Sequence, residues 1–145
     1  MTHDDGQGVW ELEDADVVLV GVSRTSKTPT CIYLANRGIK AGNIPIVLGV
    51  NLPHELLSSR SPLIVGLTND ARNLLQVRRN RLRMLNEDAE TNYVNPESIA
   101  KEVSFAKRLF NQQNWPVIDI TRRSIEETAA AIIKLRAQRH EREVD

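Results

Sequence analysis

Short apolar runs alternate with helical segments along the chain, and this alternation constrains the fold more than any other feature. The run at 17–20, Val-Val-Leu-Val, is apolar throughout and is ended by Gly21, which is typical of a strand buried on both faces of a parallel sheet. Similar runs predict strands at 44–48, 63–67 and 116–120. The segments between them predict helices at 29–37, 70–85, 96–113 and 124–136, with a helical turn at 53–57. The expected fold is therefore α/β, with a parallel sheet flanked by helices.

Local signals support several of these boundaries. Gly38 is a suitable C-cap for the first helix, and Asn95 followed by Pro96 is a typical helix start. The sequence Ser-Ile-Glu-Glu at 124–127 has the spacing of a capping box. Pro45 lacks the N–H that a central strand would need, so we expect the second strand at an edge of the sheet.

The composition is that of one globular domain. With 145 residues, 41% of them hydrophobic, the chain is expected to form one core over 15–139, between an acidic segment at 1–14 and a tail at 140–145. No apolar run approaches the length of a membrane span, and the start lacks the features of a signal peptide. The single cysteine, Cys31, cannot form an internal disulfide and is interpreted as a core thiol. We therefore expect a cytoplasmic protein with no membrane partner.

Charge is distributed unevenly. Ten Lys or Arg lie between Val17 and Asn86, where the only acids are Glu55 and Asp70. This excess favours an anionic ligand, with phosphates as the obvious candidates. Nucleic acid is disfavoured because six aromatic residues offer few stacking platforms and no known binding pattern accompanies the charge.

The segment between the first strand and the first helix carries the clearest chemical signal. It matches three of the four fixed positions of the phosphate-loop (P-loop) pattern, with serine in place of the second glycine. In such loops backbone N–H groups and the helix N-terminus surround a phosphate. Lys27 would reach the terminal phosphate as the catalytic cation, and the Thr28 hydroxyl could hold Mg²⁺. Serine is tolerated if position 26 does not require a positive φ. The candidate nucleotide-binding residues are Gly21, Val22, Ser23, Arg24, Thr25, Ser26, Lys27 and Thr28.

Five arginines in the 70–85 helix give a second signal. At 100° per residue, Arg78 and Arg81 fall within the apolar arc, whereas Arg72, Arg79 and Arg83 lie off it and are expected to be solvated. A buried arginine needs a partner, and a bound phosphate chain would supply one. Arg78 and Arg81 are therefore candidate phosphate contacts. The alternative is that they extend to solvent or pair with Glu97, Glu102 or another subunit.

Taken together, several segments resemble the regulatory proteins of pyruvate, phosphate dikinase and phosphoenolpyruvate synthetase. The resemblance runs from about residue 4 to 135 and is carried by 21–30 (Gly-Val-Ser-Arg-Thr-Ser-Lys-Thr-Pro-Thr), 33–35 (Tyr-Leu-Ala), 65–68 (Val-Gly-Leu-Thr), 76–82 (Gln-Val-Arg-Arg-Asn-Arg-Leu) and 115–128 (Trp-Pro-Val-Ile-Asp-Ile-Thr-Arg-Arg-Ser-Ile-Glu-Glu-Thr). It implies a P-loop fold like that of nucleoside kinases, with serine or glycine used at position 26.

The resemblance also implies a bifunctional enzyme. One activity is a serine/threonine-protein kinase that uses ADP to phosphorylate a threonine of the dikinase or synthetase. The other uses inorganic phosphate to remove that phosphoryl group and releases pyrophosphate. Members of the family are about twice this length, so the chain resembles their C-terminal half, and its partners would include the missing N-terminal half. The alternatives are a small-molecule P-loop kinase and a nucleotide-binding half-domain that is inactive alone.

Three other polar residues are interpreted as non-catalytic. Asp119, at the end of the last predicted strand, is read as a structural residue, by analogy with the closing strand and helix of small kinases. His54 and His140 have no acid or nucleophile at a telling spacing, so both are expected at the surface.

Overall fold

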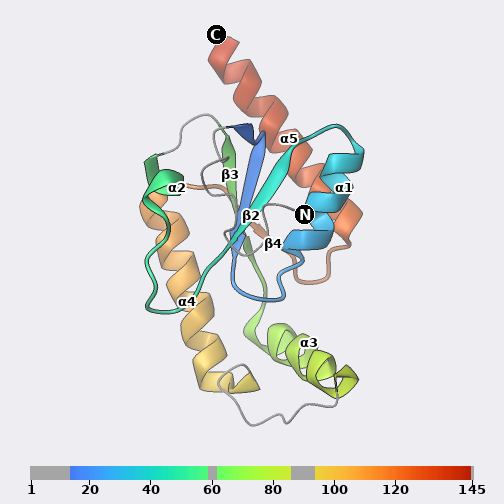
Figure 1. The fold of residues 1–145 in the computed structure, drawn as a ribbon, viewed down its shortest axis with the longest axis vertical. Coiled ribbons are helices and arrows are strands. Elements are labelled where there is room, and N and C mark those ends of the chain that lie inside the picture. Colours follow the sequence, from blue (N-terminus) through green and yellow to red (C-terminus); the bar gives the residue numbers. More distant parts are fainter. Residues whose placement is uncertain (1–13, 59–61, 86–93, 145) are drawn as a thin grey trace.

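A four-stranded parallel sheet forms the centre of the molecule (Figure 1). The computed structural model describes residues 14–58, 62–85 and 94–144. The strands are β1 (Val17–Gly21), β2 (Ala41–Pro45), β3 (Leu63–Thr68) and β4 (Val117–Asp119). They lie in the order β2-β1-β3-β4, and each neighbouring pair is parallel. The predicted parallel α/β sheet is confirmed, and β2 is the edge strand that Pro45 indicated.

Helices lie on both faces of the sheet. They are α1 (Lys27–Asn36), α2 (His54–Ser58), α3 (Ala71–Met84), α4 (Pro96–Gln113) and α5 (Ile125–Val144). In Figure 1, α1 and α5 cover one face, α2 and α4 lie on the other, and α3 extends beyond the carboxyl ends of the strands. Because all strands are parallel, the loops that follow them meet at this carboxyl edge.

The core is divided by the sheet into two layers. Along β1, Val17 and Leu19 pack with side chains of α1 and α5, whereas Val18 and Val20 pack with the apolar face of α4. All five residues of β1 are buried. The uninterrupted apolar run at 17–20 therefore reflects burial on both faces.

Local capping agrees with the sequence signals. The Asn95 side chain accepts hydrogen bonds from the N–H groups of Glu97 and Ser98 at the start of α4. Before α5, Glu127 N donates to Ser124 Oγ and Ser124 N donates to Glu127 Oε1, which confirms the capping box. Gly38 has φ 81° just after α1.

Three elements differ from expectation by two residues or more at a boundary. β2 covers 41–45 instead of 44–48, because its parallel register with β1 pairs Val17 with Ala41 and ends at Gly21 with Pro45. α1 starts two residues early, at Lys27, directly after the loop. α5 continues past 136 to Val144, into the segment expected as a tail, since 137–144 contain neither Gly nor Pro to end a helix. The acidic residues at 1–13 lie outside the described residues.

No helix within the described ranges combines the length and the apolar character needed to cross a bilayer.

Candidate functional site

The loop at residues 21–28 joins the central strand β1 to α1 at the carboxyl edge of the sheet. Arg24 and Ser26 both have a positive φ, 67° and 62°, and Thr25 between them does not. Alternation of right- and left-handed residues turns successive backbone N–H groups toward one side, which forms an anion-binding concavity. The positive φ values of Arg24 and Ser26 are compatible with such a concavity, and we refer to residues 21–28 as the anion loop.

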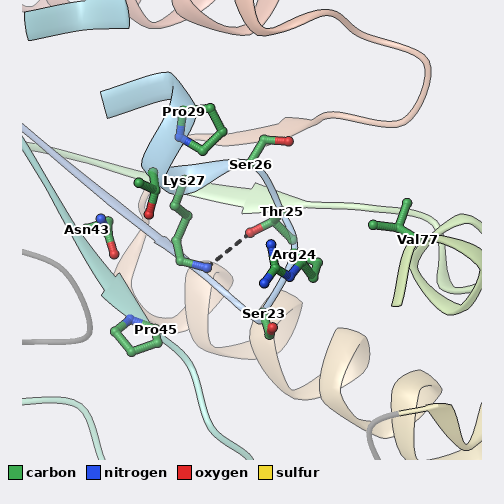
Figure 2. Close-up of a pocket in the computed structure, with 10 residues that line it drawn as sticks. Ser23, Arg24, Thr25, Ser26, Lys27, Pro29, Asn43, Pro45 and Val77 are labelled. Carbon is green, nitrogen blue, oxygen red and sulfur yellow. Dashed lines mark hydrogen bonds between the residues drawn. The ribbon is translucent and has the colours of Figure 1, made fainter. Parts of the chain in front are cut away.

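A cavity of about 460 Å³ opens over the anion loop (Figure 2). This volume falls in the usual range for small-molecule sites. Six of the eight predicted nucleotide-binding residues line it, from Ser23 to Thr28. Pro29, Asn43 and Pro45 of the neighbouring elements and Val77 of α3 complete the lining. Pro29 simply follows the loop in the chain, whereas Asn43, Pro45 and Val77 were not predicted, because their approach depends on the strand order and on the position of α3.

Gly21 and Val22 support the loop without lining the cavity. A Cβ on Gly21 would lie 2.8 Å from both the carbonyl oxygen of Leu67 and Thr25 Oγ1, so only glycine fits here. The Val22 carbonyl accepts hydrogen bonds from Thr25 Oγ1 and from Lys27 Nζ, each at 2.8 Å. These contacts hold the loop in a compact turn.

Lys27 places its ammonium group inside this turn. The residue is only 9% exposed, and Nζ also lies 3.4 Å from Thr25 Oγ1 (dashed line in Figure 2). Thr25 itself is fully buried. A cation held in such a water-poor position interacts more strongly with an anion than a surface lysine does.

The backbone conformation of Ser26 contradicts the condition under which serine was expected to be tolerated at this position. Serine was expected to be tolerated if position 26 did not need a positive φ, but Ser26 has φ 62° and ψ 27° at the start of α1. Its side chain makes no capping hydrogen bond to the helix. The loop therefore keeps a left-handed residue where the pattern has glycine, and serine adopts that conformation.

Arg78 is buried as predicted, but it already has a partner. It is 1% exposed and forms a two-point ion pair with Glu102 of α4, at 2.9 and 3.1 Å. Arg78 Nη2 also donates to the Ser23 carbonyl at 3.2 Å. The expectation that Arg78 lacks a protein partner is wrong, and the alternative pairing with Glu102 is confirmed. Arg78 is not among the residues that line the cavity.

Arg81 is exposed, so its predicted place on the buried face is wrong. The buried strip of α3 contains only Leu74, Arg78 and Leu82, because the helix packs against α4 and not flat on the sheet. Arg81 lies one turn after Val77, which lines the cavity. The other three arginines of α3 are exposed as predicted: Arg72, Arg79 and Arg83.

Polar side chains after β3 and β4 form a separate network. Asp119 Oδ1 accepts hydrogen bonds from the backbone N–H and the hydroxyl of Thr121, at 2.9 and 2.6 Å, and that hydroxyl also lies 2.9 Å from Asn69 Oδ1. Burial alone would raise the pKa of Asp119, but the two hydrogen bonds from Thr121, with the charges of Lys107 and Arg123, hold that pKa below its usual value. A carboxylate that is kept ionised in a turn fits the structural role predicted for Asp119.

The remaining predictions on single residues agree where they can be compared. Cys31 is fully buried in the core between α1 and α5, and His54 is exposed. The His140 side chain lies outside the described part of the molecule.

Magnesium fits this site only together with a ligand. Among the described residues, no three or more His, Cys, Asp or Glu side chains form a metal-binding group, and no carboxylate lines the cavity. The side-chain oxygens of the lining come from hydroxyl groups and one amide, and among them Thr28 and Asn43 could contribute to coordination of an ion. Mg²⁺ in nucleotide sites takes much of its coordination from phosphates and water, so this donor set suits a phosphate-bound ion.

The fold and the anion loop together define a parallel α/β protein with a ligand cavity at the carboxyl edge of its sheet. Comparison with known proteins agrees: a family model described as kinase/pyrophosphorylase matches residues 1–133. The chain belongs to this kinase/pyrophosphorylase family.

Curated relatives carry the name of a pyruvate, phosphate dikinase regulatory protein. The one from Erythrobacter litoralis is 58% identical over 142 residues, which cover 98% of this chain and 51% of the relative. Those from Caulobacter vibrioides and Maricaulis maris are each 58% identical over 135 residues, covering 93% of this chain and 43% and 48% of the relatives. The chain thus spans about half the length of these relatives, in agreement with its resemblance to one half of a family member.

Proposed function

We propose that the anion loop binds the phosphate chain of ADP. We further propose that the protein, when joined to the N-terminal half that longer family members carry, phosphorylates a threonine of pyruvate, phosphate dikinase or phosphoenolpyruvate synthetase. The observation that carries this proposal is the alternating backbone of residues 23–27 beneath a cavity of about 460 Å³. Membership of the kinase/pyrophosphorylase family supports phosphoryl transfer, and the names of the relatives support the dikinase as target.

In the forward reaction the threonine Oγ bonds to the β-phosphorus of ADP. The bond from that phosphorus to the bridging oxygen breaks, AMP leaves with the bond's electrons, and the threonine proton passes to a base. The backbone N–H groups of the anion loop would hold the β-phosphate. Lys27 would neutralise the charge on the moving phosphoryl group in a water-poor site.

Two further residues would assist. The Thr28 hydroxyl would help to hold Mg²⁺, which neutralises phosphate charge when bound. Arg81, one turn beyond Val77 at the cavity, would approach the phosphates from α3. In the reverse reaction inorganic phosphate attacks the phosphothreonine phosphorus, the threonine oxygen leaves and takes a proton, and pyrophosphate forms. The same loop suits these anions.

The test follows labelled phosphate. The chain, alone and joined to the remaining half of a relative, is incubated with ADP labelled at the β-phosphorus and with purified dikinase or synthetase. We expect label on a threonine of the target with the joined protein, and release of labelled pyrophosphate when phosphate is then added. A Lys27→Ala variant should transfer little label, and Lys40→Ala, an exposed control, should transfer as much as the wild type.

Other outcomes identify the rival functions. Label in a metabolite and none in protein would make the chain part of a small-molecule kinase. Binding of ADP with no transfer under any condition would make it a nucleotide-binding module. Either result contradicts the proposed protein kinase.

A further inference from the structure

A buried ion pair connects two helices to the anion loop. Arg78 comes from α3 and Glu102 from α4, 24 residues apart in sequence, and the guanidinium reaches the Ser23 carbonyl, 55 residues away. Arg78 is 1% exposed and Glu102 is 19% exposed. One guanidinium group thus joins three segments at the carboxyl edge of the sheet.

The bond to Ser23 fixes the orientation of a loop peptide. The described residues contain no cis peptide bond, and in a trans peptide the C=O and N–H point in opposite directions. A Ser23 carbonyl held toward Arg78 therefore aims the N–H of Arg24 away from Arg78. Ser23 and Arg24 both line the cavity, and Arg24 is the first of the two residues of the anion loop that have a positive φ. The direction of this N–H decides whether the loop can present it to an anion.

The chemistry of arginine suits this double contact. Its planar guanidinium carries donors in a fixed fork, so it can bind a carboxylate at two points and still donate to a carbonyl. Lysine has one nitrogen on a flexible chain and cannot hold this planar geometry. An ion pair that served only to join α3 and α4 would need no contact with the loop.

From this geometry we infer that Arg78, oriented by Glu102, is a positioning residue for the anion loop. It holds the Ser23–Arg24 peptide in the orientation that presents the Arg24 N–H to a bound phosphate chain. Arg78 touches no ligand in this role, since it does not line the cavity. The inference rests on the proposed function for the identity of the ligand, but the loop orientation it describes belongs to the free protein.

The test separates positioning from stability. Removal of one partner leaves a buried charge alone, so single variants lose stability for a reason unrelated to the loop. The double variant Arg78→Met/Glu102→Leu replaces the pair by apolar side chains of similar size, which commonly restores stability but provides no donor for Ser23. We expect a melting temperature near that of the wild type and a Kd for ADP raised about tenfold, which corresponds to the loss of one hydrogen bond. Without ligand, the backbone amides of Arg24 and Thr25 should show lower NMR order parameters than in the wild type, because the Ser23–Arg24 peptide is no longer held.

Two matched variants complete the experiment. Arg79→Gln removes the neighbouring exposed arginine and should change neither the order parameters nor the affinity. Arg78→Lys keeps the charge but not the planar fork, and it should also lower the order parameter of the Arg24 amide. Wild-type order parameters and affinity in the double variant would overturn the inference; if that variant does not fold, the same result in Arg78→Lys would overturn it. If the wild type binds no ADP, the proposed function fails, and the order parameters of the free protein still decide the role of Arg78.

Discussion

Ser26 adopts an unfavourable backbone conformation in the anion loop. A left-handed conformation costs an L-residue about 1–2 kcal/mol relative to glycine, and Ser26 has φ 62°. Its side chain makes no hydrogen bond that caps α1. The strain is therefore stored in a residue that lines the cavity, as is common at functional sites.

Replacement of Ser26 by glycine should remove this strain. We expect Ser26→Gly to leave the free energy of unfolding unchanged or to raise it by up to about 1 kcal/mol, because the gain in the folded state exceeds the entropy that glycine adds to the unfolded chain. Ser23→Gly is the matched control, because Ser23 is exposed and lacks a positive φ, and it should lower that free energy by about 0.5–1 kcal/mol. Chemical denaturation of both variants measures the difference. A larger loss for Ser26→Gly than for Ser23→Gly would contradict the strain.

At this scale the sequence could predict the loop but not the contacts of its residues. The spacing of Gly21, Lys27 and Thr28 indicates phosphate chemistry by itself, and the cavity brings together six of the eight predicted residues. Glu102 as the partner of Arg78 could be offered only as an alternative. Which acid meets a buried arginine depends on how two helices pack, and helical periodicity does not contain that information.

Among the elements, α4 packs closely on the centre of the sheet. A Cβ on Gly66 of β3 would lie 2.6–2.7 Å from three ring atoms of Phe110, which is fully buried. Glycine at this position lets the ring lie directly on the strand. The approach of α4 to β3 therefore depends on the absence of a side chain at residue 66.

Gly66→Ala should lower the free energy of unfolding by about 1–3 kcal/mol, because the added methyl group overpacks the core against Phe110. The cost should be smaller when Gly66→Ala is measured in a Phe110→Leu background, where the ring atoms are gone. Thermal or denaturant unfolding of the four proteins gives this coupling energy. Equal costs in the two backgrounds would show that the ring is not the obstacle.

The elements were predicted more reliably than their edges. Apolar runs identified all four strands because burial on both faces leaves a continuous signal. The exception in position is β2, whose Ala-Gly-Asn start has little strand propensity and is placed by its pairing with β1. The buried face of α3 was predicted too wide because a helix at the sheet edge is covered by one neighbour and buries a narrow strip.

For the whole molecule, the parallel sheet explains where the cavity lies. The strand order β2-β1-β3-β4 puts β1 in the middle, so the anion loop leaves the centre of the carboxyl edge, beside the end of β2. The order and the cavity could not be deduced from strand positions alone, since several parallel arrangements share the same alternation. Because the chain spans about half the length of its relatives, phosphate binding is the part of the proposed function that is tested most directly on this chain alone.

Affinity for ADP, measured by titration calorimetry on the wild type, Lys27→Ala and Lys40→Ala, tests this proposal most directly. The wild type and the exposed control Lys40→Ala should bind ADP equally. Lys27→Ala should lose about 2–4 kcal/mol of binding free energy, because the anion loop loses the buried ammonium group that the proposal assigns to the phosphates. Unchanged affinity in Lys27→Ala, or no binding by the wild type, would contradict the assignment of residues 21–28 as a nucleotide-phosphate site.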